Sequence, residues 1–191
     1  MSRPKSDSKR KAILDAAMRV FADQGVTNTP TSAISKAAGV AEGSLFTYFK
    51  TKAELLNELY LEMRQDFDRQ LGEFPFGTDA RVRLRHVWDT FLDIGIANPK
   101  RIPVMRQLRA SGKLMKDNEK AGRMVIETLN AMRDATSNSE FHDAPLELLV
   151  LLLRAHGEAT IEYIVAHPEE EALSRELGFD LIWNGMTGQT K

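Results

Sequence analysis

The feature that most constrains the fold is a pair of short helical segments joined by a glycine turn. Apolar residues recur three and four positions apart in segment 13–21, in segment 30–38 and again from Ala41 onward, as in helices with one buried face. Gly39 ends the middle segment, because glycine readily adopts the left-handed conformation found at helix ends, and Val40 adds an apolar side chain to the turn. This spacing predicts a helix-turn-helix, whose second helix enters the DNA major groove.

Local signals place the helix ends. Ser8 is the predicted N-cap of the first helix, which ends at Gly25, and Thr29 is the predicted N-cap of the second, with Pro30 at its first helical position. The rest of the chain has the same period, and no run alternates as a strand would. We therefore expect an all-α fold of about nine helices in two modules. The later helices are predicted at about 52–71, 79–97, 99–111, 117–136, 145–166 and 169–186.

The charges are unevenly distributed. Residues 1–52 contain nine Lys and Arg and four Asp and Glu, a net charge of +5, whereas residues 53–191 carry a net charge of −6. A basic module on an acidic body favours binding to a polyanion such as nucleic acid. A solvated basic tail is the alternative explanation, because five of the nine cations lie in the first eleven residues.

The sequence lacks the motifs that are typical of metal, cofactor and catalytic sites. There is no cysteine, and the histidines at 86, 142, 156 and 167 do not have metal-ligand spacing. Phosphate-binding glycine loops and the Gly-x-Ser-x-Gly motif are also missing, so we expect no metal, no cofactor and no enzyme activity. No apolar run exceeds six residues, and the basic N-terminus does not resemble a signal peptide. These features predict a cytoplasmic protein that does not contact membranes.

The segment from Ala41 has one apolar and one polar-aromatic face. Leu45 and Phe49, four residues apart, are predicted to pack against the first two helices. Hydroxyl groups on the outer face can meet base edges or phosphates, and aromatic rings can contact thymine methyl groups. The alternative is that every aromatic side chain of this segment is buried in the core, and we expect this for Phe49 alone. Lys50 is expected to reach a phosphate. The predicted outer face comprises Glu42, Gly43, Ser44, Phe46, Thr47 and Tyr48.

Residues from about Lys9 to Glu58, which include "ILDAAMRVFADQG" and "TPTSAISKAAGVAEGSLFTYFKTKAELL", resemble the DNA-binding domain of the TetR family of transcriptional regulators. The resemblance implies a DNA-binding domain at 1–52, a helical ligand-binding and dimerisation domain at 53–191, and an Ω-shaped homodimer. It also implies that Thr31 and Ser32 touch the phosphate backbone and that Lys52 binds phosphate. The outer face of the third helix would then face the groove.

Two residues depart from the usual pattern of that family. Ser35 stands where alanine is common, and this change is expected to cost little. Glu42 places an acid at the start of the recognition helix. A carboxylate there repels phosphate but can accept a hydrogen bond from the amino group of cytosine. Alternatively, Glu42 simply favours the positive end of the helix.

In the body, the resemblance implies that the last two long helices pair with their copies in a partner subunit. The alternative for these helices is an ordinary intrachain core. The predicted interface residues are Ala155, Gly157, Ala159, Leu173, Leu177, Leu181, Ile182, Trp183 and Met186.

An effector cavity is predicted among the preceding helices, although the same residues also suit a plain core. Its apolar wall would comprise Trp88, Phe91, Met105, Leu108, Met124, Leu129 and Tyr163, with Arg109, His86 and His156 near a polar ligand group. This composition favours a hydrophobic or amphipathic effector. The chain is thus expected to be a ligand-responsive regulator, most simply a repressor, that leaves a palindromic operator when the effector binds. The alternatives are an all-α enzyme acting on small molecules or a helical interaction module without DNA binding.

Overall fold

The computed structural model describes residues 4–114, 123–135 and 144–187, and all secondary structure in these ranges is helical. This confirms the predicted all-α fold. The chain forms two compact units, one of Met1–Gln65 with Lys100–Lys120 and one of Asp66–Pro99 with Ala121–Lys191. The predicted division was after Lys52, whereas the contacts divide the long helix α4 (Lys52–Leu71) between Gln65 and Asp66.

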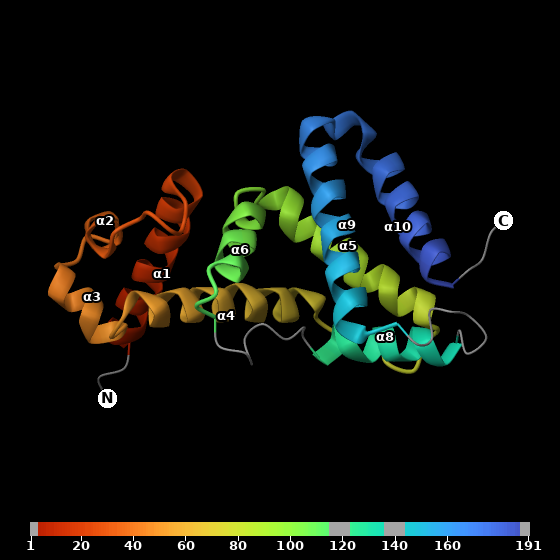
Figure 1. The fold of residues 1–191 in the computed structure, drawn as a ribbon, viewed down its shortest axis with the longest axis horizontal. Helices are drawn as coiled ribbons and strands as arrows, with labels where there is room; N and C mark the ends of the chain where they lie inside the picture. The colour runs from red at the N-terminus through yellow and green to blue at the C-terminus, as the bar shows by residue number, and fades with distance from the viewer. Residues whose placement is uncertain (1–3, 115–122, 136–143, 188–191) are drawn as a thin grey trace. The chain divides into compact units, whose positions relative to one another are not determined.

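The first unit contains the helix-turn-helix. Its elements are α1 (Pro4–Gln24), α2 (Thr31–Ala37), α3 (Glu42–Tyr48), the first part of α4, and α6 (Arg101–Ala110), as Figure 1 shows. Gly39 has a φ of 67°, the left-handed conformation that its place between α2 and α3 required. The shared core draws side chains from all five helices, including Ile13, Phe21, Ile34, Leu45, Leu55, Leu56, Val104 and Leu108.

Two predicted N-caps are wrong. Helix α1 begins at Pro4, so Ser8 lies inside it, and Asp7 instead supplies negative charge to the first turn. Thr29 is buried and its hydroxyl donates to the carbonyl of Gly25 at 2.5 Å. It therefore satisfies a carbonyl just beyond the end of α1, and Pro30 takes the N-cap position of α2.

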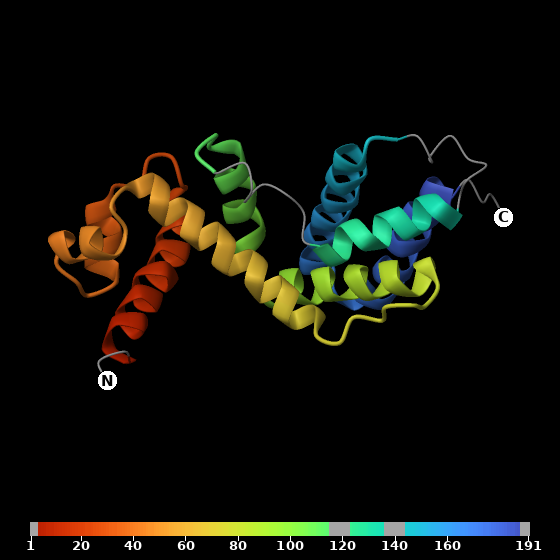
Figure 2. The ribbon, with the colours of Figure 1, turned by 90° about the horizontal axis from the view of Figure 1, so that it is seen from below.

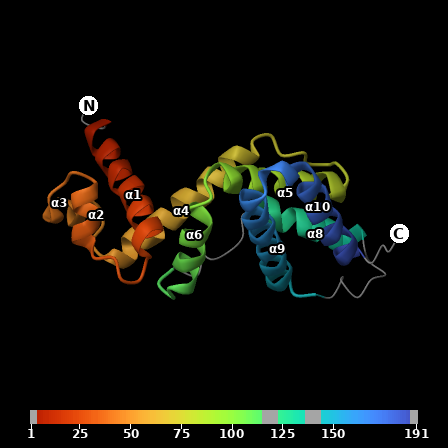
Figure 3. The same ribbon diagram turned by 90° about the horizontal axis from the view of Figure 1, so that it is seen from above.

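The second unit contains α5 (Ala80–Ala97), α8 (Arg123–Ala135), α9 (Leu146–Ala166), a short turn at Pro168–Glu170, and α10 (Glu171–Thr187). Helix α8 lies alongside α5 (Figure 2), and α9 and α10 pack against each other (Figure 3). A Cβ atom added at Gly178 would lie 2.7 Å from the Trp88 ring, and one at Gly157 would lie 2.7 Å from Phe91. These glycines allow α9 and α10 to approach α5 closely.

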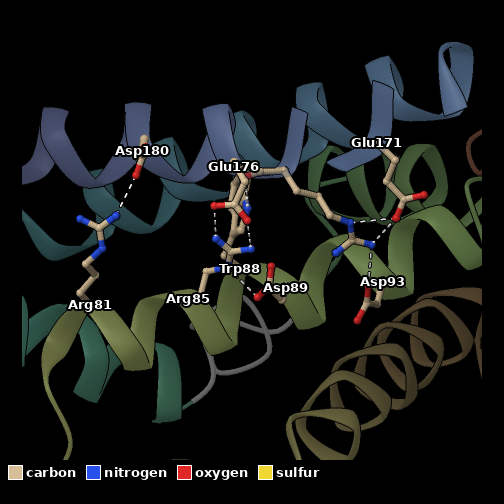
Figure 4. A network of polar contacts seen from close by, with 9 residues as sticks. Arg81, Arg85, Trp88, Asp89, Asp93, Glu171, Glu176 and Asp180 are labelled. Carbon is tan, nitrogen blue, oxygen red and sulfur yellow. Dashed lines mark hydrogen bonds and ion pairs between the residues drawn. The ribbon is translucent and has the colours of Figure 1, made fainter. Parts of the chain in front are cut away.

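Arginine side chains join α5 to α10 (Figure 4). Arg81 pairs with Asp180 at 2.8 Å, and Arg85 pairs with Glu176 at 2.6 Å. Arg175 of α10 reaches back to Asp93 of α5 at 2.6 Å. The same face of α10 carries the buried ring of Phe179, whose centroid lies 5.2 Å from the Arg81 guanidinium. One side of α10 is therefore committed to the chain's own fold.

Candidate nucleic-acid interface

Helix α3 has one buried and one exposed side, as its pattern predicted. Leu45 and Phe49 are fully buried, which confirms that they anchor the helix to the core. Five of the six predicted outer residues are exposed, and Tyr48 is half-buried against the core. The exposed five are Glu42, Gly43, Ser44, Phe46 and Thr47.

The exposed side of α3 combines aromatic, hydroxyl and open backbone surface. Phe46 is 41% exposed although its side chain is large and apolar. A Cβ atom added at Gly43 would meet no atom within 4 Å, so a partner can approach the backbone there. The Thr47 hydroxyl donates to the Gly43 carbonyl at 3.2 Å, which holds it against the helix. Such a surface can contact base edges, methyl groups and phosphates.

The start of α2 lies against the start of α3. The Thr31 hydroxyl donates to Glu42 Oε1 at 3.1 Å, while Ser32 is exposed. The structure thus brings a residue predicted to contact phosphate together with one predicted to face the groove. Ser35 is buried, and its hydroxyl donates to the Ser32 carbonyl at 3.0 Å, so its polar group is satisfied.

The ammonium group of Lys52 contacts the loop between α1 and α2. Its Nζ donates to the carbonyls of Val26 at 3.0 Å, Thr27 at 3.2 Å and Thr29 at 2.6 Å. Burial lowers the pKa of Lys52, and the nearby charge of Lys113 lowers it further. The predicted phosphate contact stays a prediction, but this side chain already has three acceptors in the protein.

Sequence reasoning missed two side chains that support this region. Gln107 of α6 accepts a hydrogen bond from the Val26 backbone N–H at 2.7 Å. Arg10 lies with its guanidinium 5.5 Å from the centroid of the Phe49 ring and pairs with Glu58. The pairs are separated by 81, 39 and 48 positions in the chain, so no local pattern signals them.

The residues of the predicted effector cavity are divided between the two units. Met105, Leu108 and Arg109 belong to α6 of the first unit, where Leu108 is a fully buried core residue and Met105 packs against that core. The others belong to the second unit and are His86, Trp88, Phe91, Met124, Leu129, His156 and Tyr163.

Within the second unit, these side chains have different surroundings. Trp88 is buried and its Nε1 donates to the Arg175 carbonyl at 3.1 Å, while the ring of His156 lies 5.4 Å away. His156 Nε2 lies 2.8 Å from the Gly178 carbonyl. Tyr163, predicted to line a wall, is instead 46% exposed and donates from its hydroxyl to Glu170 at 2.7 Å.

Met124 packs against the cluster of Leu71, Phe74 and Val87. His86 Nε2 lies 2.6 Å from the Leu71 carbonyl. Leu129 is fully buried, and Phe91 is half-buried. Trp88 and His156 thus have partners within the chain's own core, and a ligand role for Phe91 and Met124 stays a prediction.

The predicted dimer-interface residues fall into two sets. Leu177 and Leu181 are 56% and 58% exposed, and Ala155 and Ala159 are exposed as well. Gly157, Ile182, Trp183 and Met186 were predicted with them but are buried within the single chain, because they lie on the inner faces of α9 and α10. The outward apolar stripe, as we call it, comprises Leu148, Leu152, Ala155, Ala159, Leu173, Leu177 and Leu181.

Among the described residues, no cluster of three His, Cys, Asp or Glu side chains has an arrangement suited to a metal ion. None of the described helices combines the length and apolar character of a membrane span.

Residues 13–59 match the family model described as "Bacterial regulatory proteins, tetR family". The transcriptional regulator AcrR of Shigella flexneri is 39% identical over 59 residues, which cover 31% of this chain and 27% of that protein. The fatty acid metabolism regulator protein of Bacillus subtilis is 28% identical over 125 residues, covering 65% of this chain and 64% of that protein. The chain thus matches less than two thirds of the length of each curated relative.

Likeness to a solved structure covers nearly the whole chain. A tetR family transcription regulator from Shewanella sp. PV-4, described as putative, superposes with a TM-score of 0.79 and 27% identity. The superposition covers 93% of this chain and 97% of that one. The matched part therefore includes the helical body as well as the helix-turn-helix.

Proposed function

We propose that this chain, which belongs to the TetR family of bacterial regulatory proteins, is a cytoplasmic transcriptional regulator that binds operator DNA through α3. One observation carries the proposal. Leu45 and Phe49 hold α3 against the core while its other side stays exposed, and these residues lie within the segment that matches the family model. The matched relatives are named as regulators, which favours this function over the enzyme alternative.

The outward apolar stripe supports a homodimer. It places exposed leucines on two neighbouring helices, α9 and α10, whose other faces pack inside the chain. In a homodimer, the outward apolar stripe of each copy would cover that of the other around a two-fold axis. The two copies of α3 would then occupy successive major-groove faces, about one helical turn apart, so the operator should be a palindrome.

The effector is proposed to be a hydrophobic or amphipathic small molecule that binds the second unit and releases the DNA. One curated relative, matched over 125 residues, is named for fatty acid metabolism, which makes long-chain fatty acids and their coenzyme A thioesters the first probes. Helix α4 passes from one unit into the other as a continuous helix, so it is the proposed mechanical link. Such coupling between sites is typically worth about 1–3 kcal/mol.

The direct test is selection of bound fragments from genomic or random duplex DNA by the purified protein, followed by gel shifts at increasing salt. We expect a palindromic site whose affinity falls steeply with salt, because neutralised phosphates release counterions. Recovery of no preferred sequence, or binding that ignores salt, would reject the DNA-binding proposal.

The effector is then tested on the selected operator. Addition of a long-chain acyl coenzyme A or the free fatty acid is expected to weaken operator binding about 5- to 150-fold if the coupling has its usual size. A short-chain acyl coenzyme A is the control, because it has the same coenzyme A group as the long-chain thioester but a much shorter apolar chain. Equal effects of long and short chains would show that the apolar chain is not what the second unit recognises.

A further inference from the structure

The acid at the start of α3 is held by a side chain from α2. Thr31 Oγ1 donates to Glu42 Oε1 at 3.1 Å, across the turn between the two helices. Thr31 is half-buried, whereas Glu42 is exposed. The contact therefore limits the directions in which the Glu42 carboxylate points from the surface of the helix-turn-helix.

The hydroxyl of Thr31 has a single proton to donate. In the structure this proton is directed to Glu42, so it is not donated to a phosphate at the same time. The family resemblance assigned Thr31 to the phosphate backbone. The observed contact gives its hydroxyl a different task, which is to orient the carboxylate.

Glu42 retains a second carboxylate oxygen. Within the described part of the chain, Thr31 is the one residue that hydrogen-bonds to the Glu42 side chain. An ionised carboxylate only accepts hydrogen bonds, so it needs a donor on the DNA. In the major groove, cytosine presents its N4 amino donor, while adenine places the acceptor N7 beside its amino group. A carboxylate therefore favours cytosine.

We propose that Glu42 determines specificity by accepting a hydrogen bond from the N4 amino group of one cytosine in each operator half-site. Thr31 is the positioning residue that holds the carboxylate for this contact. The inference rests on the DNA-binding function proposed above and adds the base that α3 recognises at its first residue.

Two other roles for this acid make different predictions. If Glu42 only interacts with the positive end of α3, its replacement lowers stability and leaves the base preference unchanged. If it only repels phosphates, its replacement strengthens binding to every sequence alike. The base preference at one operator position separates the three roles.

The experiment selects binding sites from a random duplex library with the purified full-length protein and its variants. The variants are Glu42→Gln, Glu42→Ala, Thr31→Val and Thr31→Ser. Asp23→Asn is the charge control, because Asp23 is an exposed acid of the same unit that pairs with Lys100, the residue before α6. Thermal melting of each variant shows that it is folded, and affinities are compared at one fixed salt concentration.

The parent protein is expected to select a cytosine at one position of each half-site and to lose about 5- to 100-fold in affinity when that base is changed. Glu42→Gln should shift the preference to adenine, whose N6 and N7 suit an amide, and Glu42→Ala should remove the preference at that position alone. Thr31→Val should weaken the preference, Thr31→Ser should restore it, and Asp23→Asn should leave it intact.

Identical sequence preferences for the parent and Glu42→Ala would overturn the inference. A uniform gain in affinity in both Glu42 variants, without a change in preference, would overturn it as well. In both cases a selected palindrome would leave the proposed DNA-binding function standing. If the parent selects no sequence at all, both the function and the inference fail.

Discussion

Lys52 lies at the start of α4 with its ammonium group among backbone carbonyls. Its three contacts go to residues 26, 27 and 29, in the loop that leads from α1 into the helix-turn-helix. The carbonyl oxygens offset the loss of water that lowers the pKa of this lysine. Lys52 therefore stabilises this loop through its charged side chain, whether or not it also contacts a phosphate.

Lys52→Met is expected to reduce the free energy of unfolding by about 1–3 kcal/mol, because hydrogen bonds from a charged donor are lost and carbonyls of the loop lose their partner. Urea unfolding of the full chain measures this change. The control is Lys50→Met, since Lys50 is an exposed lysine two positions earlier whose backbone N–H, not its side chain, makes the contact with Glu54. Unchanged stability in Lys52→Met, together with a salt dependence of operator binding lowered by about one per subunit, would make Lys52 a phosphate anchor alone.

The buried residues of α3 were predictable, but the partners of Lys52 were not. Helical periodicity alone puts Leu45 and Phe49 on one face, so their burial follows from spacing. The contacts of Lys52 and Thr29 depend on the path of the loop at residues 25–29. Side chains from α4 and α6, together with Thr29 of the loop itself, fix that path, and no local pattern contains this information.

At the scale of elements, α6 supports the same loop from another side. Gln107 Oε1 accepts the N–H of Val26 at 2.7 Å, and Val26 is 1% exposed. A Cβ atom at Gly25 would lie 3.3 Å from the same oxygen, so the loop and α6 fit closely. Helix α6 thereby helps to set the entry of the chain into α2.

Gln107→Leu is expected to cost about 1–3 kcal/mol in unfolding free energy, because it leaves a buried backbone N–H without an acceptor. Gln107→Glu is the matched variant, since it retains an oxygen at the same position and should cost less. Chemical denaturation of both variants measures the difference. Equal losses would mean that the size of the side chain, and not the hydrogen bond, supports the loop.

The contact of α5 with α10 predicts a dependence on pH. The hydrogen bond from Arg85 lowers the pKa of Glu176 below its ordinary value of 4.5. The folded state therefore favours the ionised carboxylate, so this contribution is present above pH 4.5 and is lost as the pH falls through the lowered pKa. Glu176 is exposed to solvent and Arg85 only half-buried, so we expect an effect of a few degrees in melting temperature at most.

Glu176→Gln should accordingly lower the melting temperature at pH 7 and show a smaller fall than the parent between pH 7 and pH 3.5. Glu73→Gln is the control, because Glu73 is an exposed glutamate in the loop before α5. Melting curves at the two pH values test the prediction. The same fall in the parent and in Glu176→Gln would show that this ion pair does not contribute to the acid sensitivity of the fold.

The periodicity of α10 predicted its apolar character but not the orientation of its faces. Leu177, Leu181 and Trp183 all suit a buried face, so their apolar character alone predicted a single interface that contains all three. Arg81 of α5 determines which side of α10 faces inward, because it pairs with Asp180 and lies over the rings of Phe179 and Trp183. Trp183 is thereby turned inward, and the leucines of the outward apolar stripe are left exposed.

At the scale of the whole molecule, the outward apolar stripe is the surface on which a second copy is proposed to bind. Leu181→Glu should convert the dimer to a monomer, because an exposed carboxylate in an apolar interface is desolvated without a partner. Sedimentation velocity or light scattering at several protein concentrations measures the mass. Val82→Glu is the control, since Val82 is an exposed apolar residue of the same unit on α5.

A variant that no longer dimerises should also bind the operator more weakly. A dimer delivers its second α3 to the second half-site at a high effective concentration, and a monomer must bind each half-site separately. Leu181→Glu is therefore expected to lose operator affinity at least about 100-fold while retaining a folded chain, since its leucine is 58% exposed within the single chain. Trp183 cannot serve in this test, because it is buried and its replacement would unfold the second unit. A Leu181→Glu protein with the mass of a dimer and the parent's affinity would place the subunit contact on another surface.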